Sequence, residues 1–486
     1  MSAWIGAVIL VAVFSVLIQR MGLAEQANAV MTVAFDSIGI IGSSELSDDE
    51  KEVGLQKNSL KLLGLFFKIV FSGALALLVP MGIVWLGDQL GLLSLEAVLN
   101  VLISPPFLIV SGLLLLGLYI ALRRKSQAKS DAYHYSAVDQ ALHRVAFKTY
   151  TTQASFADIE DRVFSKQLDL CQSSRPVFIT ALPRAGTTLL LECLATLPEF
   201  ATHCYRDMPF VLLPCFWNRY SRAFQRDVRR QERAHGDGME IDVDSPEALE
   251  EIIWKTFWTR HYKENLIIPW SGDRNPSFEV FFRSHMRKII LLRRRSGDTA
   301  RYVSKNNANI ARTEVLRGLF PDAAIVIPFR NPFHHAMSLL QQHHNFLAIH
   351  ERDSFASEYM AAIGHYDFGQ NLRPINFDGW LDHRQSPDAE SLNFWLEYWI
   401  ASYRHLLNEA YSTLSFVNYD RLCQDPEGGL RRLAEVIHTK DVEALTAQKV
   451  QIGRPRSKQI DMSTIHPSLR HEASGIYDQL SAAACF

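Results

Sequence analysis

Apolar residues are concentrated in three long runs near the N-terminus of the 486-residue chain. Residues 1–19 carry no charged side chain, and neither do Ile69–Gly87 or Ser104–Leu122; the third run ends at the basic triplet Arg123-Arg124-Lys125. A helix crosses the hydrocarbon core of a bilayer with about 20 apolar residues. The pattern therefore predicts a membrane domain over residues 1–125 with three transmembrane α-helices, at about 3–19, 66–87 and 104–122.

The charged residues between these runs indicate how the helices are oriented. The segment between the second and third runs holds Asp88 and Glu96 and no basic residue. The segment between the first and second runs holds the basic residues Arg20, Lys51, Lys57 and Lys61. The positive-inside rule then places that segment, and everything after Arg123, in the cytoplasm. The N-terminus lacks a basic n-region and a small-residue cleavage site, which predicts an uncleaved anchor. We expect a multi-pass integral membrane protein whose C-terminal domain is cytoplasmic.

The rest of the chain has the pattern of a mixed α/β domain. Residues 126–174 are polar and are predicted to form a juxtamembrane linker. From Arg175 onwards, apolar strands, glycine-containing loops and helices follow one another, which favours a parallel sheet flanked by helices over residues 175–486. A long irregular stretch at about 206–300 is interpreted as a substrate-facing insertion.

Composition excludes several classes of protein. With 48% hydrophobic and 21% charged residues, the chain is neither disordered nor collagen-like. Lys+Arg 50 against Asp+Glu 52 gives a formal net charge of −2, so nothing global favours binding to nucleic acid. Any anion site must therefore be local. The six cysteines form no C-x-x-C pair, which argues against a zinc site or a disulfide framework.

The first candidate anion site is a strand, a loop and a helix beginning at Pro176. Pro176–Ala181 predicts a buried strand and Leu189–Thr196 a helix, so backbone N–H groups and the positive end of the helix dipole converge on the loop between them. That arrangement binds phosphate. Arg184 adds a forked cation, and two threonines add hydroxyl donors. The Walker A spacing is absent, which removes the main support for an ATPase or GTPase. The loop sequence is Pro183-Arg184-Ala185-Gly186-Thr187-Thr188.

A second candidate anion site follows another apolar run. Ala324–Phe329 predicts a buried strand with Arg330 at its carboxyl end, and Asn331-Pro332 opens a helix in which Ser338 lies eight residues after Arg330. Open α/β sheets bind ligands at the carboxyl ends of their strands. Arg330 and Ser338 are therefore predicted to hold a second phosphate.

Together these two elements resemble the sulfotransferase family, and in particular its bacterial, membrane-attached branch. In that family a P-[KR]-S-G-T-T loop binds the 5′-phosphosulfate of 3′-phosphoadenosine-5′-phosphosulfate (PAPS), and a later Arg and Ser, eight positions apart, bind its 3′-phosphate. Segments 304–321 and 418–427 are also similar to family motifs, and the resemblance covers about 176–458. One departure is Ala185, where the family usually has Ser.

The resemblance implies a sulfotransferase fold, PAPS as co-substrate, adenosine 3′,5′-bisphosphate as product and no metal. Arg184 and Lys305 would stabilise the charge that develops on the leaving phosphate, and Lys305 could also protonate it. We also expect Arg454 and Arg456 to close over the 3′-phosphate. The other donor-binding residues implied are Pro183, Arg184, Ala185, Gly186, Thr187, Thr188, Arg330 and Ser338.

Transfer to a hydroxyl also requires a group that accepts its proton. Family members use a Glu just after the helix that follows the phosphate loop, or a His. The carboxylate nearest to that position is Asp207, and His235 in His-Gly-Asp-Gly is the rival. We favour Asp207, while either residue could instead only pin a loop.

Topology points to the class of acceptor. PAPS is a cytosolic donor, and three spans are more than an anchor requires, so we expect a lipid or glycolipid hydroxyl at the cytoplasmic leaflet of the bacterial inner membrane. Two alternatives are a P-loop-type nucleotide kinase or hydrolase and a non-catalytic membrane scaffold with a relic fold.

Oligomeric state, and whether the insertion acts as a lid or a membrane contact, stay open. Four histidines on the helix after Asn331 are interpreted as a helix surface or the dimer face of a homo-oligomer. They are His334, His335, His343 and His344.

Overall fold

The computed structural model describes residues 2–22, 26, 29–30, 33, 37, 40, 48–102, 104, 137–221, 231–232, 240–241, 243–294, 300–382, 388–409, 414–453 and 460–486. The chain divides into two compact units, Met1–Tyr135 and Ser136–Phe486. Each unit is described by itself.

The described part of the first unit is helical. It contains α1 (Ser2–Arg20), α3 (Asp48–Gln89) and α4 (Leu95–Leu102). α1 has no acidic residue in its first turn and ends at Arg20. A small apolar core joins the three helices through Ala7, Val84 and Val98, all of which are buried.

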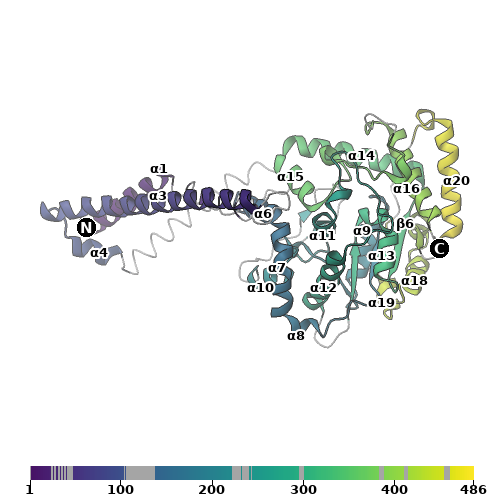
Figure 1. Ribbon diagram of the computed structural model, residues 1–486, viewed down its shortest axis with the longest axis horizontal. Coiled ribbons are helices and arrows are strands. Elements are labelled where there is room, and N and C mark those ends of the chain that lie inside the picture. The colour runs from purple at the N-terminus through teal and green to yellow at the C-terminus, as the bar shows by residue number, and fades with distance from the viewer. Residues whose placement is uncertain are drawn as a thin grey trace. The chain divides into compact units, whose positions relative to one another are not determined.

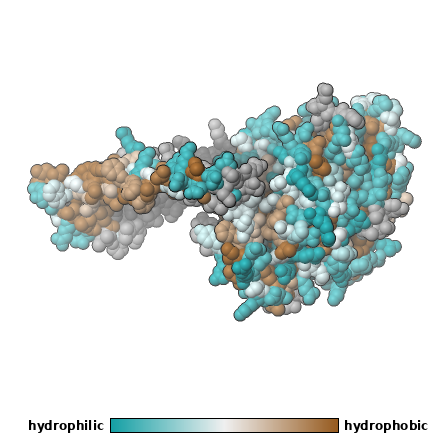
Figure 2. Space-filling model, in the orientation of Figure 1, coloured by the Kyte–Doolittle hydropathy of each residue, from teal (hydrophilic) through white to brown (hydrophobic). Residues whose placement is uncertain are grey.

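Helix α3 has the length and composition of a membrane span. Among the described residues it is the one helix long and apolar enough to cross a bilayer. Its apolar side chains, among them Phe66, Phe67 and Leu78, are largely exposed, and on the face shown in Figure 2 apolar side chains gather over this helix. Exposed surface of this kind is favourable in lipid and unfavourable in water.

The three predicted spans have different outcomes. The second, at 66–87, lies inside α3. The first, at 3–19, is helical in α1, and as a membrane span it stays a prediction. The third, at 104–122, lies outside the described residues apart from Ser104. One span is therefore supported, and a bundle of three is not confirmed.

A parallel sheet of five strands forms the centre of the second unit (Figure 1). This confirms the α/β prediction. A separate antiparallel pair joins β3 (Gln231–Glu232) and β4 (Glu240–Ile241). In spatial order the strands of the main sheet are β2 (Phe200–Ala201), β5 (Arg301–Lys305), β1 (Val177–Ile179), β6 (Ala324–Phe329) and β7 (Ser415–Asn418).

Helices cover both faces of this sheet because successive strand side chains point in opposite directions. Val177 and Ile179 belong to a buried cluster with residues of α9 and α18. Phe178 points to the other face, where its ring lies 6.4 Å from that of Phe282 in α12. The helices of the unit are α6 (Ala137–Lys148), α7 (Tyr150–Val163), α8 (Ser165–Leu168), α9 (Thr187–Ala195), α10 (Pro214–Ser221), α11 (Glu251–Phe257), α12 (Pro276–Arg293), α13 (Thr313–Leu319), α14 (Pro332–Arg352), α15 (Ser354–Ile363), α16 (Leu392–Asn408), α17 (Tyr419–Gln424), α18 (Pro426–Ile437), α19 (Val442–Thr446) and α20 (Pro467–Ala483).

Strand order creates a crevice at the carboxyl end of β1. β1 lies between β5 and β6, with Ile179 opposite both Lys305 and Val326. From β1 the chain passes through α9 to β2 on one side, and it later crosses from β5 to β6 on the other. Ligands of open α/β sheets bind at such a switch point, so the loops after β1, β5 and β6 are the ones that form the site.

Much of the predicted linker, 126–174, belongs to the second unit. The buried ammonium of Lys288 in α12 lies 2.9 Å from Glu160 and 2.8 Å from Asp161 in α7. A buried charge of this kind needs such partners. Residues 137–174 are thus part of the compact unit Ser136–Phe486. Because Lys288 is far from α7 in the sequence, local composition gave no sign of this packing.

The predicted substrate-facing insertion, 206–300, is largely core. Helix α12 lies within it, and Phe278 and Phe282 of that helix are fully buried. Among the described residues of this stretch, only a short segment around Pro246–Glu251, together with Ile267, reaches the crevice beside β1.

Candidate active site

The loop between β1 and α9 has a backbone that requires glycine. Arg184 has a φ of 70° and Gly186 a φ of 95°, both in the left-handed region. A Cβ atom on Gly186 would lie 2.4 Å from the ring of Tyr419. Because side chains are excluded here, the backbone can turn directly into α9. The N–H groups of the first turn of a helix have no partner inside the helix and favour an anion.

His335 pins this loop from α14. Its Nε2 atom lies 2.8 Å from the carbonyl oxygen of Pro183. Because a carbonyl can only accept a hydrogen bond, Nε2 is the donor. Burial, with a further contribution from the nearby Arg330 guanidinium, lowers the pKa of His335 to about 3. The imidazole is therefore neutral at pH 7 and holds the loop as a hydrogen-bond donor. His335 and His343 are buried, so the predicted helix surface or dimer face is wrong for these two.

The two predicted anion sites lie together. Arg184 Nε donates to Ser338 Oγ at 3.5 Å, and Arg330 Nη1 donates to the carbonyl oxygen of Arg184 at 3.4 Å. The Arg330 guanidinium also lies 5.8 Å from the ring centroid of Tyr419. Arg330 and Arg184 are 146 residues apart in the sequence, so the fold brings the loop after β1 and the start of α14 to one place.

A cleft with a volume of about 230 Å³ opens beside this loop. Ala185 is fully buried and does not line it, so the departure from the usual Ser leaves the cleft wall unchanged. The predicted residues that line the cleft are Pro183, Arg184, Gly186, Thr187, Thr188, Lys305 and Arg330. Further lining residues that the sequence did not single out are Glu247, His365, Tyr366, Asp367 and Arg373.

A chain of polar contacts joins several residues that line the cleft. Thr187 Oγ1 donates to Asn307 Oδ1 at 3.4 Å, and Asn307 Nδ2 donates to Asp367 Oδ2 at 3.1 Å. His365 Nε2 lies 3.6 Å from the same Asp367 oxygen. Burial lowers the pKa of His365; Asp367 opposes this shift and Lys305 adds to it. The contacts tie the phosphate loop to the segment after α15.

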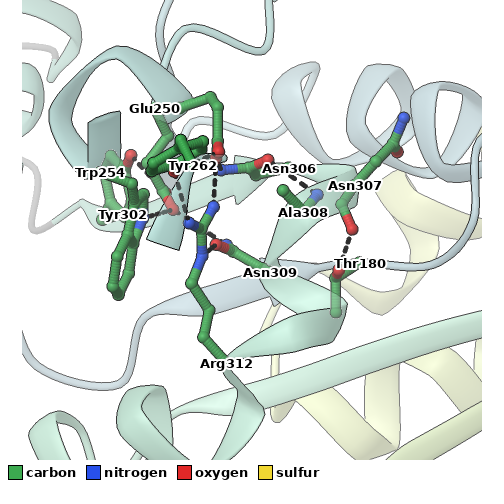
Figure 3. Close-up of polar contacts among 11 residues, drawn as sticks. Thr180, Glu250, Trp254, Tyr262, Tyr302, Asn306, Asn307, Ala308, Asn309 and Arg312 are labelled. Atoms are coloured by element: carbon green, nitrogen blue, oxygen red, sulfur yellow. Dashed lines mark hydrogen bonds and ion pairs between the residues drawn. The ribbon is translucent and has the colours of Figure 1, made fainter. Parts of the chain in front are cut away.

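The segment 306–312 makes a network of polar contacts, which includes Asn309, Arg312 and Tyr262 (Figure 3). Arg312 is fully buried, lies 4.0 Å from the ring centroid of Trp254 and forms an ion pair with Glu251. Asn306 Nδ2 donates to Glu251 at 2.8 Å, and Asn309 Nδ2 donates to Glu250 at 2.9 Å. Lys305, Asn306 and Asn307 line the cleft. Asn306, Asn309 and Arg312 contact Glu250 or Glu251 at the start of α11.

Glu247 enters the cleft on a strap held by backbone hydrogen bonds. Its N–H donates to the carbonyl oxygen of His203 at 2.9 Å, and the N–H of Tyr205 donates to that of Ser245 at 3.2 Å. Within the described ranges, no cation lies within ion-pair distance of the Glu247 carboxylate. Sequence patterns gave no signal for this residue because its position depends on pairing with residues 203–206.

The structure corrects the prediction for Asp207. This residue lies in the 3-10 helix η1 (Tyr205–Asp207) and is 1% exposed. One carboxylate oxygen accepts from the N–H of Cys204 at 2.9 Å, and the other pairs with Arg293 Nη2 at 2.5 Å. Both oxygens are occupied, and Asp207 does not line the cleft, so it is wrong as the proton acceptor. The other three predicted residues, His235, Arg454 and Arg456, lie outside the described residues.

The chain is similar in sequence and in fold to known sulfotransferases. The sequence model of the sulfotransferase family matches residues 176–371. No curated protein matches the chain. Sulfotransferase STF9 from Mycobacterium avium is 14% identical over 70% of this chain and 85% of its own, with a TM-score of 0.41. Sulfotransferase STF1 from Mycobacterium tuberculosis is 13% identical over 68% and 84%, with a TM-score of 0.38. A sulfotransferase from Alicyclobacillus acidocaldarius is 14% identical over 64% and 94%, with a TM-score of 0.30.

Proposed function

We propose, on the premise that residues 176–371 belong to the sulfotransferase family, that the chain transfers a sulfonate group from PAPS to a hydroxyl of an acceptor. One observation carries the proposal. Arg184 is hydrogen-bonded both to Arg330 and to Ser338, which lie on a distant segment of the sequence, beside the N-terminus of α9. Unrelated functions occur on one fold, so the chemistry of the site decides. Here two guanidinium groups lie beside the N-terminus of α9, which also favours an anion.

The residues present fit the two anionic ends of PAPS, which when bound supplies the activated sulfonate. Arg184, the hydroxyls of Thr187 and Thr188 and the first N–H groups of α9 would hold the 5′-phosphosulfate end. Arg330 and Ser338 would hold the 3′-phosphate. Within the described ranges, no carboxylate lies within ion-pair distance of the Arg330 guanidinium, so its charge is available to a ligand.

Two cations would stabilise the transfer itself. Lys305 ends β5 at the cleft, and Arg184 lies in the phosphate loop that follows the neighbouring strand β1. During an in-line displacement, negative charge moves to the bridging oxygen of the leaving phosphate. Preorganised donors aimed at such charge are worth about 10²–10³ in rate each. Lys305 can in addition give that oxygen a hydrogen bond.

We assign the acceptance of the proton to Glu247. The O–H bond of the acceptor hydroxyl breaks as its oxygen bonds to sulfur, and the proton passes to the Glu247 carboxylate. The bond between sulfur and the bridging phosphate oxygen breaks, and its electron pair stays on that oxygen. His365 is the rival, but its Nε2 atom faces Asp367. We therefore assign this pair to the positioning of Asn307 and the phosphate loop.

The proposed acceptor is a lipid or lipid-linked hydroxyl at the cytoplasmic leaflet. Helix α3 supports this part because it is long and apolar enough to span a bilayer. A membrane-held enzyme with a cytosolic donor meets acceptors that the inner leaflet presents. The multi-pass topology of the sequence-based prediction belongs to the same proposal.

Transfer of labelled sulfonate from PAPS to a membrane lipid extract tests the function. The wild type should produce label that partitions into organic solvent, whereas Arg184→Ala and Lys305→Ala should each lower the rate about 10²–10³-fold. Arg352→Ala, at the exposed end of α14, is the matched control and should keep the wild-type rate. Equal rates in all four proteins would refute the assignment of the site. Label only in water-soluble products would refute the lipid acceptor.

A further inference from the structure

Arg373 places an additional cation in the cleft, on a segment distant in sequence from the phosphate loop. It lines the cleft with Tyr366, and its guanidinium lies 4.3 Å from the ring centroid of that tyrosine. The N–H of Arg373 donates to the carbonyl oxygen of Tyr366 at 2.9 Å. Next along the chain, the carbonyl oxygen of Pro374 accepts from the N–H of Ile267 at 3.0 Å. The half-buried side chain is thus carried by a backbone that is fixed on both sides.

The carboxylates near this end of the cleft already have partners. Glu251 pairs with Arg312 and also accepts from Tyr262 Oη at 2.5 Å and from Asn306. Asp367 accepts from Asn307 at 3.1 Å. In the part of the chain that the structure describes, no carboxylate lies within ion-pair distance of the Arg373 guanidinium.

A second cation strengthens the positive potential around Tyr366. Lys255 Nζ lies 5.0 Å from the centroid of the same ring, and it donates to the carbonyl oxygen of Ala362 at 3.1 Å. Two cations therefore flank one ring, and their partners are a π face and backbone carbonyl groups. A guanidinium that is stacked on one side keeps its planar N–H edge available, and that edge matches a carboxylate, phosphate or sulfate.

Within the described ranges, no hydrogen bond or ion pair joins the Arg373 side chain to a residue of the proposed donor site. Arg330 and Tyr419 mark the donor end. The contacts from Thr187 through Asn307 to Asp367 connect the phosphate loop to the segment that carries Tyr366 and Arg373. An anion bound by Arg373 would therefore use none of the residues assigned to the two anionic ends of PAPS.

We infer that Arg373 binds an anionic group of the acceptor, so that the substrate of the proposed sulfonate transfer is a hydroxyl compound that already carries a phosphate, carboxylate or sulfate. The inference rests on the proposed function. Apolar residues line the same cleft, among them Ile267, Ile363 and Phe368, and they suit an acceptor that is acidic at one point and apolar beside it.

Fractionation of the acceptor tests this inference without knowledge of its identity. An extract of the cells that make the protein is separated by anion exchange into retained and unretained material, and each part is divided into organic-soluble and water-soluble fractions. The full-length wild type is then assayed on every fraction with labelled PAPS. Label should enter only material that the resin retained. An organic-soluble product indicates a lipid headgroup and a water-soluble product a free anion; both support the inference.

Variants connect the result to Arg373. Arg373→Gln should lower kcat/KM for the retained acceptor about 10- to 100-fold, mainly through KM, as expected for the loss of a charged hydrogen bond. Arg373→Lys should recover part of the loss, and exposed Arg352→Gln should match the wild type. Affinity for adenosine 3′,5′-bisphosphate, measured by calorimetry, should be the same in Arg373→Gln as in the wild type, which also shows that the variant is folded.

Three results would contradict the inference. Transfer to unretained material alone would overturn it while leaving sulfonate transfer in place. Loss of nucleotide affinity in Arg373→Gln as large as in Arg330→Ala would move Arg373 to the donor site. Transfer to none of the fractions would contradict the proposed function itself, and the inference with it.

Discussion

The cleft and the ion pair between Asp207 and Arg293, here called the corner, contain the same kinds of charged residue. These residues have different partners in the two places. At the corner, Asp207 and Arg293 are close together and partly or fully buried, and they neutralise each other. In the cleft, Arg330 donates to a backbone carbonyl oxygen, and Glu247 has no cation within ion-pair distance among the described residues. Charges that neutralise each other stabilise a fold, whereas charges without a counterpart in the protein remain available to a ligand or a proton.

The largest expected effect is a difference in kcat between variants of Glu247 and Asp207. Glu247→Gln should lower kcat about 10²–10⁴-fold, because the amide cannot take the hydroxyl proton. Asp207→Asn, assayed on its folded fraction under the same conditions, should lose far less. Steady-state rates with labelled PAPS provide the comparison. A larger loss of kcat in Asp207→Asn than in Glu247→Gln would restore Asp207 as the proton acceptor.

The free energy of unfolding should change in the opposite order, with the larger loss in the Asp207 variant. Asp207→Asn leaves Arg293 without its counter-charge and should lower the free energy of unfolding by about 3–5 kcal/mol. Glu247→Gln breaks no ion pair among the described residues, and its free energy of unfolding should stay within about 0.5 kcal/mol of that of the wild type. Urea unfolding of both variants measures the difference. Equal destabilisation of the two would mean that Glu247 has a structural role as well.

A smaller effect is expected in the backbone of the phosphate loop. Gly186→Ala forces a side chain into the left-handed region and against Tyr419, and it should cost about 1–3 kcal/mol. It should also weaken binding of adenosine 3′,5′-bisphosphate. Gly453→Ala, where an added Cβ meets nothing within 4 Å, is the matched control. Unchanged stability and nucleotide affinity in Gly186→Ala would show that the loop does not need its observed backbone.

Acid should lower the stability of the second unit through two buried histidines of α14. The pKa of His335 is lowered to about 3 and that of His343 to about 4, mainly by burial. Below their ordinary value near 6.5 the unfolded chain therefore binds protons that the folded chain does not. The free energy of unfolding should fall as the pH drops from about 6.5 towards 4. His335→Gln, whose amide can still donate to Pro183, should reduce this dependence in urea unfolding series. An unchanged pH dependence would contradict the neutral, buried state of His335.

How far the sequence predicted the site depends on whether each contact is local. The strand, loop and helix from Pro176 to Thr196 lie within one continuous segment, and so do Arg330 and Ser338. Residue spacing was therefore sufficient to predict these local elements. The bond between His335 and Pro183 joins residues 152 apart, and the partner of Asp207 is 86 residues away.

Long-range pairing therefore explains what the sequence could not supply. Asp207 pairs with Arg293, and His335 donates to Pro183 in the phosphate loop. Glu247 lies in the cleft because its N–H donates to the carbonyl oxygen of His203. The same reason applies to segment 306–312. Its composition indicated a functional motif, but its division between the cleft and the buried network around Glu250 and Glu251 follows from packing.

The central claim is that one cleft binds both anionic ends of PAPS, and calorimetric titration with adenosine 3′,5′-bisphosphate tests it most directly. The wild type should bind the nucleotide at one site. Arg184→Ala and Arg330→Ala should each weaken binding, and the double variant should show none, while Arg352→Ala should match the wild type. Equal affinity in all these proteins, or no binding by the wild type, would contradict the account.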